Sequence, residues 1–212
     1  INSPDKTIVE QLSLLLNVPQ QIAYLLVQRG ITSFDQAKKY FRPAWEDLHD
    51  PFRMKDMTSA VKRIAYSIES GESVMIFGDY DVDGTTSVAL MTSYLKNHIE
   101  VVVPYIPDRY KEGYGVSKAG IQKAQAEGIT LIIALDCGIK AHEQIEYANT
   151  LGIDFIICDH HLPNSLLPKA VAVLDPKRAD CEYPYKELCG CGIGFNLIQA
   201  LNQYFELALT DL

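Results

Sequence analysis

Long apolar runs and a secretory leader are both missing from this sequence. No apolar run approaches the ~20 residues that a helix needs to cross a bilayer. The first residues, 1–6, do not form a basic segment followed by an apolar one, so no secretory signal is expected. The sequence therefore predicts a protein that neither inserts into a membrane nor carries a signal peptide.

Cysteine is scarce, and the five cysteines have no spacing typical of a disulfide framework. Cys189 and Cys191 form a C-x-C pair without a second pair at the distance that a zinc site requires, so ordinary packing is favoured over zinc. Cys137 and Cys158 end apolar runs and are expected to be buried. A reducing, cytoplasmic location suits this set best.

A surplus of basic residues is also missing. Lys and Arg number 19 against 27 Asp and Glu, which gives a net charge of −8. Simple nucleic-acid-binding modules are usually basic, so the charge argues against that class. Several acidic residues are clustered, however, and bound divalent metal ions would cancel their charge. The acidity therefore weighs less against a metal-dependent enzyme that acts on nucleic acid.

The sequence divides into two parts near residue 70. Before it, Ile8, Leu12 and Leu15 recur at helical spacing, and Ser33 and Gln36 have the spacing of a capping box. From residue 73 onward, short apolar runs alternate with amphipathic helical segments. We therefore predict a helical N-terminal region over 1–70 and a second domain over 71–212.

The second domain has the pattern of an α/β fold. Five short apolar runs lie at 74–77, 101–103, 131–135, 155–158 and 170–174, and helices are expected at 85–98, 117–127, 141–151 and 193–208. The runs are β-branched and apolar at successive positions, as in strands that helices cover on both faces. The alternation predicts a parallel β-sheet flanked by helices, with right-handed crossovers.

Acidic residues and histidines follow three of the predicted strands directly. They are Asp79, Asp81 and Asp83 after the first strand, Asp136 after the third, and Asp159, His160 and His161 after the fourth. Open parallel sheets bind ligands outside the carboxyl ends of their strands. Carboxylates with one or two imidazoles suit Mn²⁺ or Mg²⁺ better than zinc or copper. Such a cluster can hold two ions ~3.5–4 Å apart, as phosphoryl displacement requires.

The segment from Asp79 opens like a calcium-binding EF-hand loop, but calcium is rejected. That loop needs a bidentate Glu at its twelfth position, where this sequence has Leu90, and a strand precedes it instead of a helix. Gly84 is expected to permit a tight turn into the next helix. Thr85 and Thr86 would then stand at the helix start, where backbone N–H groups can hold a phosphate.

Three segments resemble the motifs of the DHH phosphoesterase superfamily: 78–87 the first, 136–138 the second and 159–161 the third. The helical front and the segment 109–117 are similar to those of RecJ-type single-strand-specific DNA exonucleases. This resemblance covers essentially the whole chain. It implies an Mn²⁺- or Mg²⁺-dependent hydrolase of DNA repair and recombination that degrades single-stranded DNA from its 5′ end.

Two other functions stay open. The superfamily also contains phosphodiesterases that act on short oligonucleotides or cyclic dinucleotides, and the substrate length accepted by the full-length protein would distinguish them. A regulatory module without activity is the third reading. Intact Asp81, Asp83, Asp136 and His160 count against it, and metal titration would decide.

The resemblance assigns roles to individual residues. It implies four metal ligands, which are Asp81, Asp83, Asp136 and His160. It implies a catalytic set of Asp79, Asp136, Asp159 and His161, acting as ligands, orienting groups or substrate contacts. The substrate contacts are predicted from side-chain chemistry and not from the resemblance. Arg109 can pair bidentately with a phosphate, or it is a solvated loop cation. Tyr114 can stack on a base, or it is a turn tyrosine that covers the core. Gly115, Thr85 and Thr86 complete the predicted substrate-binding residues. For Gly190, Gly192 and Gly194 we expect close helix packing or a helix start that faces a phosphate.

Family members continue beyond the closing helix with another acidic motif and a second domain that grips the substrate. This sequence ends at 210–212, before such a motif. The resemblance therefore implies a piece of a longer protein with an incomplete metal site. We expect the isolated chain to cleave DNA very weakly or not at all.

Overall fold

The computed structural model describes residues 3–207 and contains two compact units, one ending at His49 and the other beginning at Asp50. The predicted end of the second domain, at 210–212, lies outside the described residues. Among residues 3–207, no helix is long and apolar enough to cross a membrane. All five cysteines are free thiols, and Cys137 and Cys158 are buried as expected.

The first unit, which we call the helical unit, contains α1 (Lys6–Leu16), α2 (Gln20–Gln28), α3 (Phe34–Phe41) and the 3₁₀ turn η1 (Trp45–Asp47). Val9 and Leu12 of α1 pack against Ala23 and Leu26 of α2 to form its small core. The predicted capping box is confirmed at α3, because Ser33 accepts from Gln36 N while the Gln36 side chain accepts from Ser33 N.

The second unit, which we call the sheet unit, begins with η2 (Pro51–Arg53) and α4 (Met57–Ser70). The sequence placed α4 in the N-terminal region, but its apolar stripe of Ala60, Val61 and Ile64 belongs to the large core of the sheet unit. Helix α4 packs against α8 and β5. The compact unit begins at Asp50, because α4 packs its apolar face onto the core of the sheet. The predicted boundary of the second domain at residue 71 stays a prediction.

Five parallel strands form the sheet: β1 (Val74–Gly78), β2 (Val102–Tyr105), β3 (Leu131–Leu135), β4 (Asp154–Cys158) and β5 (Ala172–Leu174). Their order is β2-β1-β3-β4-β5. The remaining helices are α5 (Val82–Leu95), α6 (Lys118–Ala126), α7 (His142–Thr150) and α8 (Gly190–Tyr204). The predicted α/β fold with a parallel sheet is confirmed.

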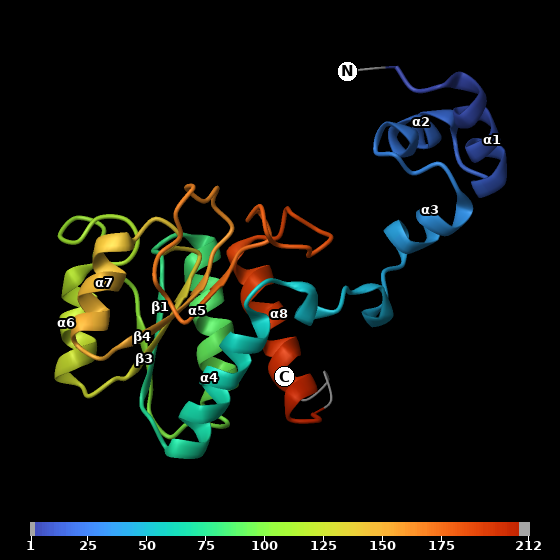
Figure 1. Cartoon of the computed structure of the whole chain (residues 1–212). Coiled ribbons are helices and arrows are strands. Elements are labelled where there is room, and N and C mark those ends of the chain that lie inside the picture. The colour runs from blue at the N-terminus through green and yellow to red at the C-terminus, as the bar shows by residue number, and fades with distance from the viewer. Residues whose placement is uncertain (1–2, 208–212) are drawn as a thin grey trace. The chain divides into compact units, whose positions relative to one another are not determined.

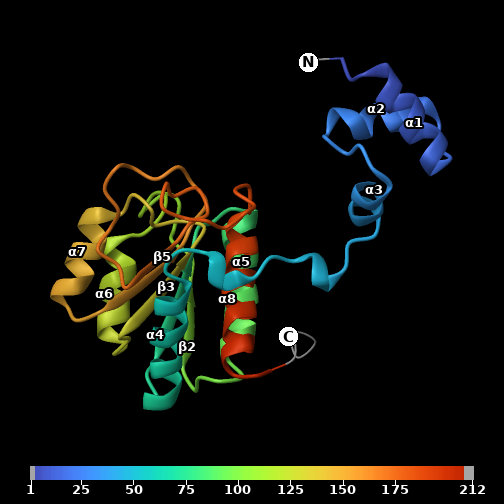
Figure 2. The same ribbon diagram turned by 45° about the vertical axis from the view of Figure 1, so that its right-hand side comes forward.

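Helices cover both faces of this sheet (Figures 1 and 2), with α4, α5 and α8 on one face and α6 and α7 on the other. Alternate strand residues supply the two cores, so that Ile76 and Ile133 enter one while Phe77 and Ile132 enter the other. The strand order reverses beside β1, which has β2 on one side and β3 on the other. Such a switch point opens a crevice at the carboxyl ends of β1 and β3.

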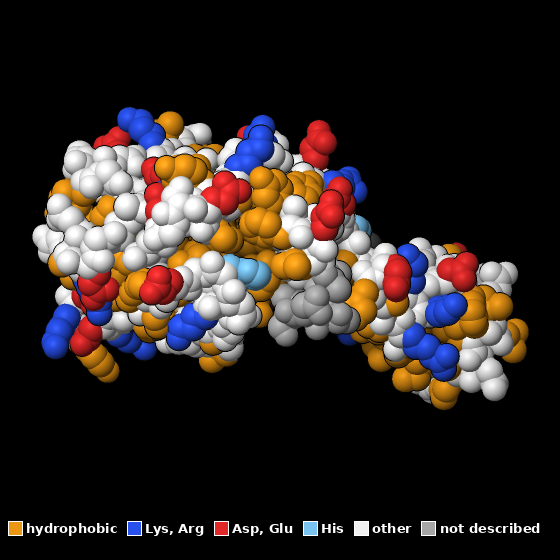
Figure 3. Space-filling model, turned by 90° about the horizontal axis from the view of Figure 1, so that it is seen from below, with side chains coloured by type: hydrophobic (Ala, Val, Ile, Leu, Met, Phe, Trp, Pro, Cys, Tyr) orange, Lys and Arg blue, Asp and Glu red, His pale blue; other side chains and the backbone are white. Residues whose placement is uncertain are grey.

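The surface carries no broad basic area on the face seen in Figure 3. Among the described side chains drawn there, acidic and basic groups are interspersed with hydrophobic ones. This agrees with the net charge of −8.

Candidate metal centre

Three aspartates occupy equivalent places at the carboxyl ends of neighbouring strands. Strand register pairs Gly78 with Leu135 and Leu135 with Cys158. The residues that follow are Asp79, Asp136 and Asp159, and all three are buried. The fold therefore brings together three acids that lie far apart in the sequence.

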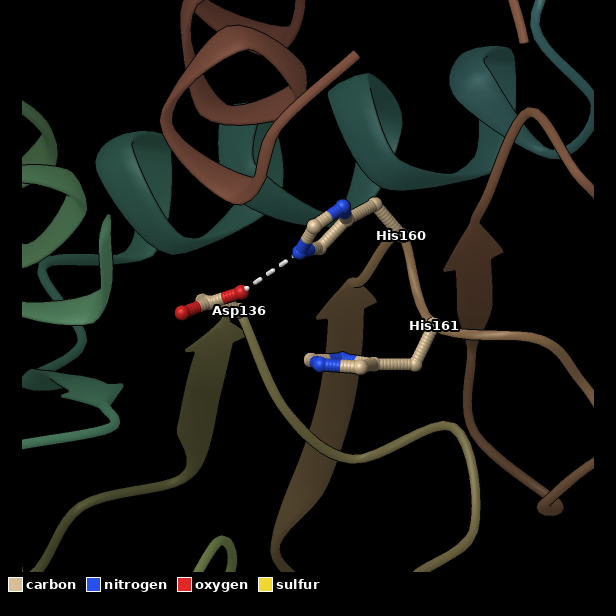
Figure 4. A group of neighbouring side chains, drawn as sticks. All are labelled: Asp136, His160 and His161. Atoms are coloured by element: carbon tan, nitrogen blue, oxygen red, sulfur yellow. Dashed lines mark ion pairs between the residues drawn. The ribbon is translucent and has the colours of Figure 1, made fainter. Parts of the chain in front are cut away.

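Two histidines complete the cluster (Figure 4). Ligand atoms of Asp136, His160 and His161 all lie within 4.8 Å of one another, and both imidazoles extend toward Asp136 from the loop after β4. His160 Nε2 is 3.1 Å from Asp136 Oδ1 and 3.6 Å from Asp83 Oδ2. Four of the predicted residues thus converge from three separate elements.

Asp136 has the most unusual environment of these groups. Its φ of 59° lies in the left-handed region, and backbone strain of this kind, about 1–3 kcal/mol, concentrates at functional sites. Its side chain is buried, and Oδ1, although 3.1 Å from His160 Nε2, accepts no hydrogen bond of proper geometry within the described part of the chain. Burial, followed by the charges of Asp83 and Asp81, raises its pKa to about 8. A cation would relieve both the desolvation and the repulsion.

Asp83 joins the start of α8 to the cluster. Its Oδ2 accepts from Gly190 N at 2.7 Å, and its Oδ1 accepts from Cys191 N at 2.8 Å. A Cβ on Gly190 would lie 2.6 Å from Asp136 Cβ, so only glycine fits there. The sequence suggested close packing or a phosphate-facing helix start; the structure has the close packing, and the N–H groups face the Asp83 carboxylate.

Asp159 acts through its neighbours. Its Oδ2 accepts from Ile139 N at 2.9 Å, while its Oδ1 accepts from His160 N at 2.8 Å and from His161 Nδ1 at 2.7 Å. Burial by itself would raise the pKa of Asp159, but these hydrogen bonds outweigh it and lower the pKa. The same bond to Asp159 raises the pKa of His161. Because the Asp159 carboxylate can only accept a hydrogen bond, Nδ1 of His161 carries the proton. Nε2 is then the His161 nitrogen that faces the other groups of the cluster.

Asp79 and Asp81 lie at the edge of this arrangement. Asp79 is buried, and its Oδ1 has no hydrogen-bond partner among the described residues. Burial raises its pKa, which backbone N–H groups, including that of Gly115, partly offset. Asp81 caps α5 by accepting from Gly84 N at 2.9 Å. Gly84 is required by a close approach and not by a turn, since a Cβ there would lie 2.4 Å from Asp79 O.

The two threonines predicted to hold a phosphate use their hydroxyls inside α5. Thr85 Oγ1 donates to Asp81 O at 2.7 Å, and Thr86 Oγ1 donates to Val82 O at 2.6 Å. Both hydroxyls are therefore already bonded to the backbone of their own helix. A role for these residues in substrate binding stays a prediction.

Tyr114 and Arg109 lie near the cluster. The Tyr114 hydroxyl is 3.4 Å from both Asp136 O and His161 Nε2, and its ring stands edge-on to that of His161. Gly115 follows with a φ of +78°, in the left-handed region that favours glycine. The Arg109 guanidinium lies 5.3 Å from the centre of the Tyr80 ring, a cation–π contact that keeps it beside the crevice.

Sequence reasoning missed Asp175, which follows β5 as the other acids follow their strands. It is fully buried, Oδ1 accepts from Lys177 N at 2.7 Å, and Oδ2 has no partner among the described residues. Burial raises its pKa to about 6. The same strand-end rule that found Asp136 could have found it.

Comparisons with known proteins agree with this geometry. The family model described as DHH family, N-terminal domain, matches residues 73–211. The chain belongs to the DHH family. This DHH chain is 41% identical over 212 residues to the single-stranded-DNA-specific exonuclease RecJ of Bacillus subtilis (strain 168), covering 100% of this chain and 27% of that protein. It therefore spans about a quarter of the length of that relative.

Two crystal structures resemble the DHH chain. The first is a structure of exonuclease RecJ bound to manganese, with a TM-score of 0.66 and 29% identity. The match covers 73% of this chain and 39% of the RecJ chain. The second is a structure of RecJ from Thermus thermophilus in complex with Mn²⁺, with a TM-score of 0.76 and 23% identity. The match covers 98% of this chain and 29% of that RecJ chain. The second likeness concerns the fold alone.

In buffer that contains a metal chelator, the metal-free DHH chain is expected to lose stability as pH rises from about 4 to about 8. The pKa of Asp136 rises on folding from 3.8 to about 8, so within this window the folded chain holds a proton that the unfolded chain has released. Stability therefore falls as pH increases through it. Melting temperatures of wild type and Asp136→Asn across this window test the idea, and the variant should show the flatter profile. Parallel profiles would contradict it.

Proposed function

We propose that this chain is the metal-binding part of a cytoplasmic exonuclease that hydrolyses single-stranded DNA from its 5′ end, using Mn²⁺ or Mg²⁺. One observation carries the proposal: the buried Asp136 carboxylate, with an oxygen that accepts no hydrogen bond among the described residues, faces His160 in a chain 41% identical to a RecJ exonuclease. DNA repair and recombination would be the setting of this activity.

The residues of the cluster fit a hard divalent cation. Carboxylate oxygens dominate, one or two imidazoles accompany them, and buried oxygens of Asp79 and Asp136 have no hydrogen-bond partner among the described residues. Asp81, Asp83, Asp136 and His160 would hold the metal. When bound, it supplies Lewis-acid stabilisation of the phosphoryl group and offsets the negative charge of the phosphodiester.

The protein's own groups would position the DNA. Asp159 fixes the ring of His161, so that its Nε2 donates to a phosphate oxygen when the imidazole is protonated, a state that its raised pKa favours. Arg109 would bind a neighbouring phosphate through its guanidinium. Tyr114 would stack on a base, an interaction that tolerates any sequence.

A labelled oligonucleotide tests the proposal. With Mn²⁺ or Mg²⁺, the full-length protein should shorten a single strand from its 5′ end and leave a blunt duplex intact. The 212-residue chain in the same assay should be far weaker, since it spans 27% of the relative's length. Cleavage confined to very short oligonucleotides or cyclic dinucleotides would favour the alternative substrate class. No hydrolysis with either metal would overturn the proposal.

A further inference from the structure

A cavity of about 230 Å³ opens beside His161, outside the group of metal ligands. Its lining comes from three loops at the carboxyl edge of the sheet. Tyr114 and Val116 come from the loop after β2, Ile139 and Lys140 from the turn before α7, and His161 from the loop after β4. The cavity therefore adjoins the place where a scissile phosphate would meet the cluster.

The size and lining of the cavity suit one nucleoside. It is smaller than the roughly 300–1,000 Å³ of clefts that bind whole drug-sized molecules. Val116 and Ile139 are buried and offer an apolar floor, and the half-exposed Tyr114 ring stands beside them. The half-buried Gln144 adds an amide that can donate and accept hydrogen bonds. An apolar floor with one aromatic ring accepts a base or sugar of any identity.

Lys140 is the one lining residue of this cavity with a fixed positive charge. It is exposed, and no carboxylate within residues 3–207 forms an ion pair with it. Its nearest acidic neighbour in the lining, Asp159, already accepts hydrogen bonds at both oxygens from Ile139 N and from His161. The ammonium group is therefore available for an anion that enters the cavity.

The backbone beside Lys140 is also fixed to the cluster. Ile139 N donates to Asp159, and Asp159 in turn holds the imidazole of His161. One carboxylate thus sets the position of the turn that carries Lys140 and the orientation of His161. A phosphate bound at Lys140 would lie in a defined relation to a phosphate at His161.

We propose that this cavity is a nucleotide subsite, in which Lys140 binds the phosphate next to the scissile one while the nucleoside rests on Val116, Ile139 and Tyr114. The inference rests on the proposed nuclease function and adds to it a specificity-determining residue. It requires a substrate with at least two consecutive phosphates, and it requires no particular base.

The test uses the full-length protein with three variants. Lys140→Ala removes the charge, Lys140→Arg keeps it, and Lys62→Ala removes a charge from an exposed lysine on α4 as the matched control. The substrates are single-stranded oligonucleotides in which one of the three linkages nearest the attacked end is a neutral methylphosphonate. KM, kcat and the salt dependence of KM are measured for each combination of protein and substrate.

Lys140→Ala should raise KM about three- to tenfold with little change in kcat, and should reduce the salt slope by about 1, as for loss of one phosphate contact. One methylphosphonate next to the cleaved linkage should raise KM for wild type and for Lys62→Ala. It should not raise KM for Lys140→Ala, because that variant has already lost the phosphate contact. Lys140→Arg keeps the positive charge and should therefore have a KM and a salt slope close to those of wild type.

Methylphosphonate effects that are equal in wild type and Lys140→Ala would overturn the subsite. The same holds if Lys62→Ala raises KM as much as Lys140→Ala does. Neither result touches the proposed function, because wild type would still hydrolyse the unmodified strand. Absence of any hydrolysis by wild type would instead remove the proposed function and the subsite together.

Discussion

Replacing Asp136 by asparagine in the full-length protein is expected to lower kcat/KM for single-stranded DNA at least about 100-fold while the fold persists. The amide has the same shape but no charge, and it is a poor ligand for Mn²⁺ or Mg²⁺. Misplacement of a metal or substrate by ~1 Å already costs about 100-fold. Asp83 is held by the backbone of α8 and Asp159 by His161, so neither carboxylate can move into the place of Asp136.

The matched control is Asp154→Asn, which makes the same chemical change at the start of β4, where Asp154 pairs with Arg63. That variant should lose some stability and keep its activity. Circular dichroism and melting curves would show that Asp136→Asn is folded. Near-normal hydrolysis by folded Asp136→Asn would remove the metal centre from the mechanism, whatever the control does.

The fold was predictable because strands buried on both faces leave a clear pattern. The apolar runs from 131 and 155 correspond closely to β3 and β4. Element ends were less accurate. Strand β2 continues to Tyr105 through Pro104, which an edge strand tolerates because it has an unpaired side. Helix α8 begins at Gly190 and not at residue 193, because the Cys189 thiol accepts from Gly192 N and caps it.

The acids of the site were predictable for the same reason, since each follows a buried strand. Their individual environments were not. Asp83 meets Gly190 across more than a hundred residues of sequence, and only the packing of α5 against α8 creates that contact. Asp159 lies beside two histidines in the sequence, yet its bond to the backbone of Ile139 depends on a loop after a different strand. Long-range contacts of this kind leave no local pattern.

Gly190 supplies a prediction that depends on such a contact. Gly190→Ala should lower activity of the full-length protein about 100-fold although every charged group of the site remains. A Cβ at this position would lie 2.6 Å from Asp136 Cβ and 2.9 Å from Asp136 Cα, and backbone cannot yield as a side chain can. Either Asp136 or the start of α8 must shift. Overpacking of this kind costs typically about 1–3 kcal/mol of stability.

The control is Gly192→Ala, two residues along the same helix. Its Cβ would meet the Leu188 side chain at 3.3 Å, and a flexible leucine can move aside. Both variants add one methyl group to the first turn of α8, so they differ mainly in what that methyl contacts. Activity, Mn²⁺ binding by calorimetry and melting temperature should all fall for Gly190→Ala and change little for Gly192→Ala. Equal behaviour of the two variants would show that the packing of α8 on Asp136 does not hold the metal centre in place, whereas loss at Gly190 alone would show that it does.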